Sequence, residues 1–158
     1  MHNTKIDINK GSREKLVVIL NQRLADASDL KSQAKQAHWN VKGMNFIALH
    51  ELFDRIATEL DPVVDDIAER ITTLGGTALG TVRIAAQNSS LAEYPLEITD
   101  GPAHADALSN ALADFGKKVR SDIDTTDGLG DADTADLFTG ISRSIDKLLW
   151  FVEAHLQS

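Results

Sequence analysis

Cysteine is absent from the chain, which excludes disulfide bonds and thiolate metal sites. Proline occurs only three times in 158 residues, so little interrupts the long helices that the composition favours. No apolar run approaches the roughly 18 residues of a membrane-spanning helix, and the polar start of the chain lacks the apolar core of a signal peptide. The chain has 16 basic and 24 acidic residues. The resulting net charge of −8 disfavours binding of nucleic-acid phosphates by the folded domain. We therefore expect a cytoplasmic protein without a membrane segment.

Apolar residues recur at helical spacing through most of the chain. We expect Ser12 to cap the first helix and the Gly75-Gly76 pair to end the second. Pro62 falls inside that second helix, where it should remove a hydrogen bond and bend the axis. Asp131 or Asp133 should cap the last helix. The expected long helices cover residues 12–40, 46–74, 100–126 and 131–156, and a short helix over residues 81–86 lies in the connection between residues 75 and 100.

Four helices of roughly 25 residues, paired by two short turns and joined by one long crossover, are typical of a ferritin-like bundle. The sequence therefore predicts an all-α fold, a ferritin-like four-helix bundle with a long crossover between helices 2 and 3 that carries a short extra helix. An up-down-up-down bundle with only short loops would not explain the crossover. We expect a single domain over residues 12–158, after a short N-terminal tail of residues 1–11.

Two histidines and three carboxylates stand close together in the sequence, namely His38, His50, Asp54, Asp65 and Glu69. His50 and Asp54 are four residues apart, as are Asp65 and Glu69, so each pair lies on one face of a helix. Imidazole and carboxylate ligands together suit divalent metals such as iron. The two pairs share a face but lie roughly 16 Å apart along the axis, because eleven residues separate Asp54 from Asp65.

One metal centre cannot use both pairs of a single straight helix. Either the chain has two half-sites with unfilled ligand shells, or a second copy runs antiparallel beside it. In that second case the His50/Asp54 end of one chain meets the Asp65/Glu69 end of its mate, and a two-fold dimer holds two identical sites. We favour the dimer, because the sequence lacks the Glu-x-x-His motif with which di-iron bundles hold metal inside one chain.

Each of these residues alone also has a plainer interpretation. His38 lies on the apolar stripe of the first helix, where a histidine is more often a core residue than a ligand. Paired carboxylates are typical of a solvated helix face. Taken together, the five residues favour a metal site, because Asp65 and Glu69 are flanked by apolar positions where unpaired carboxylates would be costly to bury.

A family resemblance rests on seven segments, which are KQAHWN (35–40), NFIALHE (45–51), DDIAER (65–70), LGG (74–76), ALGT (78–81), DTAD (133–136) and DKLLWF (146–151). They are similar to the Dps family, the miniferritins also called DNA-protection-during-starvation proteins, and the likeness runs from about residue 14 to 154. The resemblance implies a hollow twelve-subunit shell with dinuclear ferroxidase centres at its two-fold interfaces. It assigns His38, His50 and Asp54 to one subunit. It assigns Asp65 and Glu69 to the partner.

The resemblance also implies a chemistry. Each centre would bind two irons, and zinc or another divalent metal can occupy the same ligands. Fe(II) would be oxidised preferentially by hydrogen peroxide, with ferric mineral stored in the cavity. The function implied is therefore that of a ferroxidase and iron store that protects against oxidative damage.

Residues outside this cluster match the family too. Trp39 matches a tryptophan beside the family's centre that supplies electrons or traps radicals, and packing at an interface explains it equally well. Asp136 and Asp146 match acidic residues that line three-fold channels for iron entry, and they share roughly one face of the last helix. Trp150 matches a family position, but its apolar neighbours favour the core. The remaining histidines should be exposed to solvent, namely His2, His104 and His155.

The N-terminal tail departs from the DNA-binding members, whose tails are long and rich in lysine. Here Lys5 and Lys10 stand against Asp7, and twelve chains at −8 each would carry about −96, which repels phosphate. We therefore expect little DNA binding. Two alternatives to the ferroxidase stay open: a nucleoid-associated protein of the same family whose main role is to bind DNA, and a structural bundle whose acidic face is incidental.

Overall fold

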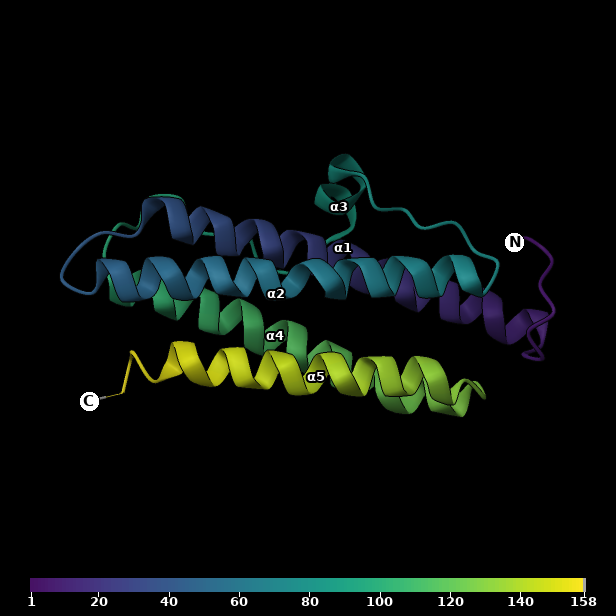
Figure 1. Ribbon diagram of the computed structural model, residues 1–158. Coiled ribbons are helices and arrows are strands. Elements are labelled where there is room, and N and C mark those ends of the chain that lie inside the picture. Colours follow the sequence, from purple (N-terminus) through teal and green to yellow (C-terminus); the bar gives the residue numbers. More distant parts are fainter. Residues whose placement is uncertain (158) are drawn as a thin grey trace.

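The computed structural model describes residues 1–157 and contains five helices (Figure 1). They are α1 (Lys10–Asn40), α2 (Phe46–Thr73), α3 (Val82–Asn88), α4 (Gly101–Gly128) and α5 (Ala132–Glu153). Apart from one isolated bridge between Lys42 and Asp100, these 157 residues contain no β structure. The predicted all-α fold is confirmed.

The long helices form two pairs, α1 with α2 and α4 with α5, and the pairs pack on each other (Figure 1). The crossover leaves the end of α2, carries α3 against α1, and returns to the opposite end of the bundle, where α4 begins. This is the connectivity of a ferritin-like bundle with one long crossover. None of the helices in residues 1–157 is long and apolar enough to cross a membrane.

Side chains just before the helices cap several of them. Asn9 caps α1, because its Oδ1 accepts a hydrogen bond from the backbone N–H of Ser12 at 2.9 Å, so the prediction that Ser12 is the cap is wrong. Asp131 caps α5, as one of the two expected candidates. The helix α2 continues through Pro62 and ends before Gly75, whose φ of +86° favours glycine.

The core lies where the four long helices meet. Leu24 of α1, Phe53 of α2, Phe115 of α4 and Phe138 of α5 are all fully buried. Burying each of these side chains stabilises the fold by about 1.5–3 kcal/mol. These buried side chains hold α1 and α2 against each other, and the candidate site lies on these two helices.

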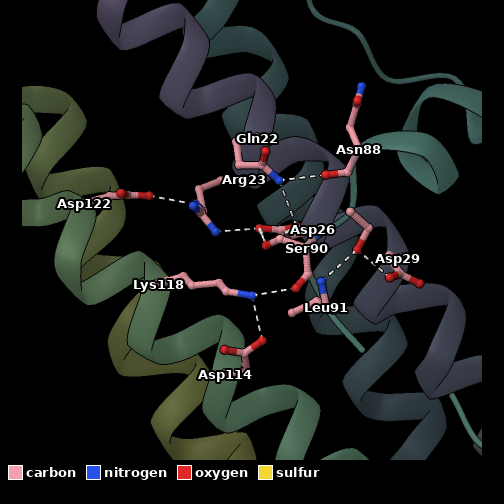
Figure 2. Close-up of polar contacts among 11 residues, drawn as sticks. Gln22, Arg23, Asp26, Asp29, Asn88, Ser90, Leu91, Asp114, Lys118 and Asp122 are labelled. Carbon is pink, nitrogen blue, oxygen red and sulfur yellow. Dashed lines mark hydrogen bonds and ion pairs between the residues drawn. The ribbon is translucent and has the colours of Figure 1, made fainter. Parts of the chain in front are cut away.

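A buried polar network fastens the crossover to the bundle (Figure 2). Asp26 of α1 is fully buried and accepts hydrogen bonds from Arg23 at 2.5 Å and from the backbone N–H of Ser90 at 2.7 Å. Arg23 also donates to Asp122 of α4 at 2.7 Å. Burial raises the pKa of Asp122, and the positive charge of Arg23 acts against this rise. Arg23 therefore lies between two carboxylates and compensates the cost of burying them.

Trp150 lies on the surface of the chain, so its expected place in the core is wrong. Its side chain is 60% exposed, whereas Leu148 and Val152 are buried. Each residue turns the helix by about 100°, so a residue midway between two core-facing positions falls on the opposite side of α5.

His104 is also placed differently from the prediction, because only 1% of it is exposed. It lies four residues before the buried Leu108, on the stripe of α4 that faces the core. That spacing was a signal for burial in the sequence. His2 and His155 are exposed, as predicted.

Candidate metal centre

The turn between α1 and α2 brings His38 and His50 into contact. Nδ1 of His38 donates to the carbonyl oxygen of His50 at 2.7 Å, and Nδ1 of His50 donates to the carbonyl oxygen of His38 at 2.8 Å. The two rings stack with their centroids 3.7 Å apart. Because a carbonyl oxygen only accepts, each Nδ1 carries the hydrogen, and each Nε2 of the neutral ring keeps a free lone pair. The two residues orient each other and leave two nitrogen atoms that suit a metal ion.

Asp54 lies one turn of α2 after His50, and Lys35 of α1 reaches it. The Lys35 Nζ lies 2.6 Å from Oδ1 of Asp54, and this hydrogen bond is the main cause that lowers the pKa of Asp54. Burial acts against this fall, and the positive charge of Lys35 adds to it. The half-exposed carboxylate therefore keeps its charge well below neutral pH, next to the two imidazoles.

Lys35 is the residue of this cluster that the sequence reasoning missed. It stands one helical turn before His38, and its Nζ also lies 5.6 Å from the centroid of the Trp39 ring. The Trp39 side chain is 66% exposed, so within one chain it does not pack into the core. Lys35 and Trp39 together border the candidate site on the α1 side.

Asp65 and Glu69 lie further along α2, and both are exposed. The expectation that their apolar neighbours bury them is wrong for the single chain, because Val63 and Ile67 turn into the core and leave the carboxylates outside. The unbroken helix keeps this pair roughly 16 Å from Asp54 along the axis. Within residues 1–157, no three His, Asp or Glu side chains gather closely enough to hold a metal ion. One chain therefore presents two partial ligand sets.

The two aspartates expected in a channel differ in their surroundings. Both are exposed on α5. Asp146 accepts two hydrogen bonds from Nη1 of Arg120 on α4, at 2.9 and 3.1 Å. Asp136 borders a shallow groove between α2 and α5, together with Glu59 and Asp66. The carboxylate of Asp146 is therefore already paired with a positive charge, and Asp136 lies among further acidic residues.

Known proteins resemble this chain over nearly its whole length. Residues 17–158 match the ferritin-like domain family. The DNA protection during starvation protein of Agrobacterium fabrum is 46% identical over 156 residues, which are 99% of this chain and 96% of the relative. The protein of the same name from Brevibacillus brevis is 33% identical and covers 94% of this chain and 99% of its own length.

Solved structures agree with these relatives. A tetragonal form of Mycobacterium smegmatis Dps has a TM-score of 0.94 and 30% identity, and the match covers 100% of this chain and 96% of that one. A Dps protein of Vibrio cholerae has a TM-score of 0.91 and 26% identity, and the match covers 99% of this chain and 98% of that one. That protein is described as a member of a broad superfamily of ferritin-like diiron-carboxylate proteins. The class is that of ferritin-like bundles. Within it, the chain belongs to the Dps family.

Proposed function

We propose that this chain is a ferroxidase and iron store. In this proposal it oxidises Fe(II), preferentially with hydrogen peroxide, and holds the ferric product inside a hollow dodecamer. The observation that carries the proposal is the His38–His50 pair, which leaves two Nε2 lone pairs free for a metal, one helical turn from the ionised Asp54. Such a mixed nitrogen and oxygen ligand set suits iron.

The partial ligand sets support a centre shared by two copies of the chain. In this arrangement His38, His50 and Asp54 of one subunit face Asp65 and Glu69 of an antiparallel neighbour. The exposure of the second pair leaves those carboxylates accessible to a partner. A two-fold axis repeats the contact, so each dimer has two identical centres.

Fe(II) is the substrate of this reaction, and the ligands differ in their roles. The two imidazoles bind through Nε2, and the carboxylates supply negative charge that stabilises Fe(III) more than Fe(II), which favours loss of an electron. Two irons together supply the two electrons, and solvent supplies the two protons, with which hydrogen peroxide becomes two water molecules, so this two-electron step releases no hydroxyl radical. Lys35 neutralises Asp54 in the metal-free chain, so an arriving cation competes with Lys35 for this carboxylate. Zinc would bind the same ligands without being oxidised.

A rapid-mixing experiment tests this activity. The assembled protein is loaded with Fe(II) without oxygen, and hydrogen peroxide or oxygen is then added while the absorbance of Fe(III) is followed. We expect rapid oxidation with peroxide, slower oxidation with oxygen, and strong inhibition of both by zinc. Oxidation no faster than that of free Fe(II) would contradict the proposal.

Iron entry gives a prediction for the two aspartates of α5. If they line a three-fold channel, Asp136→Asn should slow iron uptake more than Asp146→Asn, because Arg120 already neutralises Asp146. The difference should shrink as the ionic strength rises, since salt screens the attraction. Initial mineralisation rates at low and high salt measure it, and equal rates for wild type and both variants at low salt would show that iron enters elsewhere.

A second candidate function, DNA binding, is favoured by the name of the relatives, DNA protection during starvation protein. The charge of −8 per chain acts against it. The start of the chain is also held on the body, where the backbone N–H of His2 donates to the carbonyl oxygen of Gly75 at 2.6 Å. We expect no retardation of duplex DNA by the protein in a gel at ~0.15 M salt, and a clear shift at that salt concentration would support the DNA-binding alternative.

A further inference from the structure

Tyr94, the only tyrosine of the chain, contacts the buried His104. Tyr94 lies near the end of the crossover, and His104 lies in the first turns of α4, where the crossover returns to the end of the bundle that holds the α1–α2 turn (Figure 1). The Tyr94 hydroxyl is 2.6 Å from Nδ1 of His104, and the two ring planes are within 18° of each other. This contact lies outside the candidate metal centre, and Tyr94 packs against the main core.

The direction of the hydrogen bond follows from the surroundings of the imidazole. Nε2 of His104 is buried without a hydrogen-bond partner among the described residues. The backbone carbonyls of Ile98 and Asn40 are the polar groups that favour a proton on this ring, together with the charge of Asp100. These groups accept and do not donate, and the Tyr94 hydroxyl is the donor beside Nδ1, so we assign the hydrogen of the neutral ring to Nε2. Nδ1 is then the acceptor, and the Tyr94 hydroxyl donates to it.

Both groups are held in the protonation states that a proton transfer needs. Burial lowers the pKa of His104, so the ring is neutral at pH 7 and has a free site for a proton. Burial raises the pKa of Tyr94 beyond its usual range, so the phenol stays protonated. A phenol loses an electron far more easily when its proton leaves in the same step, because the product is then a neutral radical.

We propose that Tyr94 and His104 form a redox-active pair that intercepts hydroxyl radicals. Tyr94 gives one electron to the radical, which becomes hydroxide, and the phenolic O–H bond breaks as its proton moves to Nδ1 of His104. The products are a neutral Tyr94 phenoxyl radical and a protonated His104. An electron from Fe(II) then reduces the phenoxyl radical, the proton returns from His104, and Fe(III) is left.

This inference rests on the proposed function, because Fe(II) and hydrogen peroxide are the source of the radical. A hydroxyl radical forms when peroxide takes up one electron instead of two. The pair lies at the same end of the bundle as the α1–α2 turn, and Asn40, whose carbonyl influences the His104 ring, follows His38 by two residues. A donor at this place removes a radical before it diffuses to less replaceable side chains.

The first test needs no iron. A light flash generates a ruthenium(III) tris-bipyridine oxidant in the presence of the metal-free assembled protein, and the phenoxyl absorbance is followed in time. Any phenoxyl signal comes from Tyr94, because the chain has no other tyrosine. We expect His104→Gln, which keeps an acceptor but not a base, to slow radical formation roughly tenfold or more, the effect of about 1.4 kcal/mol on the barrier. Wild type should also be slower in deuterated water.

Two variants make the result specific. Tyr94→Phe keeps the ring and should abolish the phenoxyl signal, whereas Trp150→Phe replaces an exposed, oxidisable indole on α5 with a phenyl ring and should leave the signal unchanged. Circular dichroism and the size of the assembly verify that each variant is folded. Equal rates in wild type and folded His104→Gln would overturn the proposal, as would the absence of a phenoxyl signal in wild type.

The second test links the pair to iron. Fe(II)-loaded protein is mixed with excess hydrogen peroxide, frozen rapidly, and examined by electron paramagnetic resonance. We expect a tyrosyl signal in wild type and more oxidised tryptophan and methionine in Tyr94→Phe. A phenoxyl radical after the flash but none with iron and peroxide would overturn the protective role. Failure of Fe(II) oxidation itself would instead count against the proposed ferroxidase, so the two failures are distinguishable.

Discussion

His38→Ala and Asp65→Asn should each lose most of the fast Fe(II) oxidation, and mixing the two inactive variants should restore part of it. The reason is that each centre draws His38 from one chain and Asp65 from the other. A two-fold pair made of one chain of each kind has one centre with both defects and one centre that is intact. Random mixing of equal amounts makes half of the pairs mixed, so about one quarter of all centres should recover.

The measurement is the initial rate of oxidation with hydrogen peroxide after the subunits are dissociated and reassembled together. Mass spectrometry verifies that the assemblies contain both variants. Asp66→Asn is the matched control, because Asp66 is the exposed neighbour of Asp65 but points about 100° away around α2, and it should keep the wild-type rate. Verified mixed assemblies with no recovered activity would contradict a shared centre.

Arg23→Met should be among the most destabilising single substitutions in this chain. It keeps much of the side-chain volume but removes the charge between Asp26 and Asp122, and it leaves two carboxylates close together in a largely buried place (Figure 2). Breaking a buried ion pair in this way costs about 3–5 kcal/mol. The free energy of unfolding, measured by guanidinium titration at one protein concentration, should fall by an amount of this order.

The pH dependence of the unfolding free energy shows whether the loss of stability in Arg23→Met comes from the unpaired carboxylates. Loss of Arg23 removes the charge that opposes the raised pKa of Asp122, so the folded variant binds a proton more readily than its unfolded chain does. Stability that depends on such a group increases as the pH falls. The deficit of Arg23→Met should therefore be smaller at about pH 5 than at about pH 8. Lys10→Met removes an exposed ion pair with Glu14 and should change stability by less than about 1 kcal/mol at either pH. A deficit for Arg23→Met that matches this control, or that grows in acid, would contradict the role given to Arg23.

The helices and their order could be predicted from the sequence, because apolar spacing and terminal signals such as Gly75 and Asp100 are local. The exact start of α1 could not, since both Asn9 and Ser12 are good capping residues and only the path of the chain decides between them. The burial of His104 differs from the expectation that a histidine lies at the surface, although its spacing from Leu108 indicates the core.

The candidate site was predicted in part. Helical spacing predicts that Asp54 lies one turn after His50, and in the structure the two residues are neighbours on α2. The exchange of hydrogen bonds between His38 and His50 was not predictable, because it depends on the angle at which α1 and α2 meet. The contact of Lys35 with Asp54 was missed for the same reason. To predict the side-chain contacts between two helices, one must know how each helix is rotated about its axis relative to the other. The periodicity of each helix alone does not determine this.

Anomalous diffraction from a crystal of the assembled protein soaked with Fe(II) without oxygen tests the shared centre most directly. We expect iron at the two-fold interface, bound by His38, His50 and Asp54 of one subunit. The remaining protein ligands should be Asp65 and Glu69 of the neighbouring subunit. Iron bound by residues of a single chain, or iron that avoids this interface, would contradict a centre shared by two subunits.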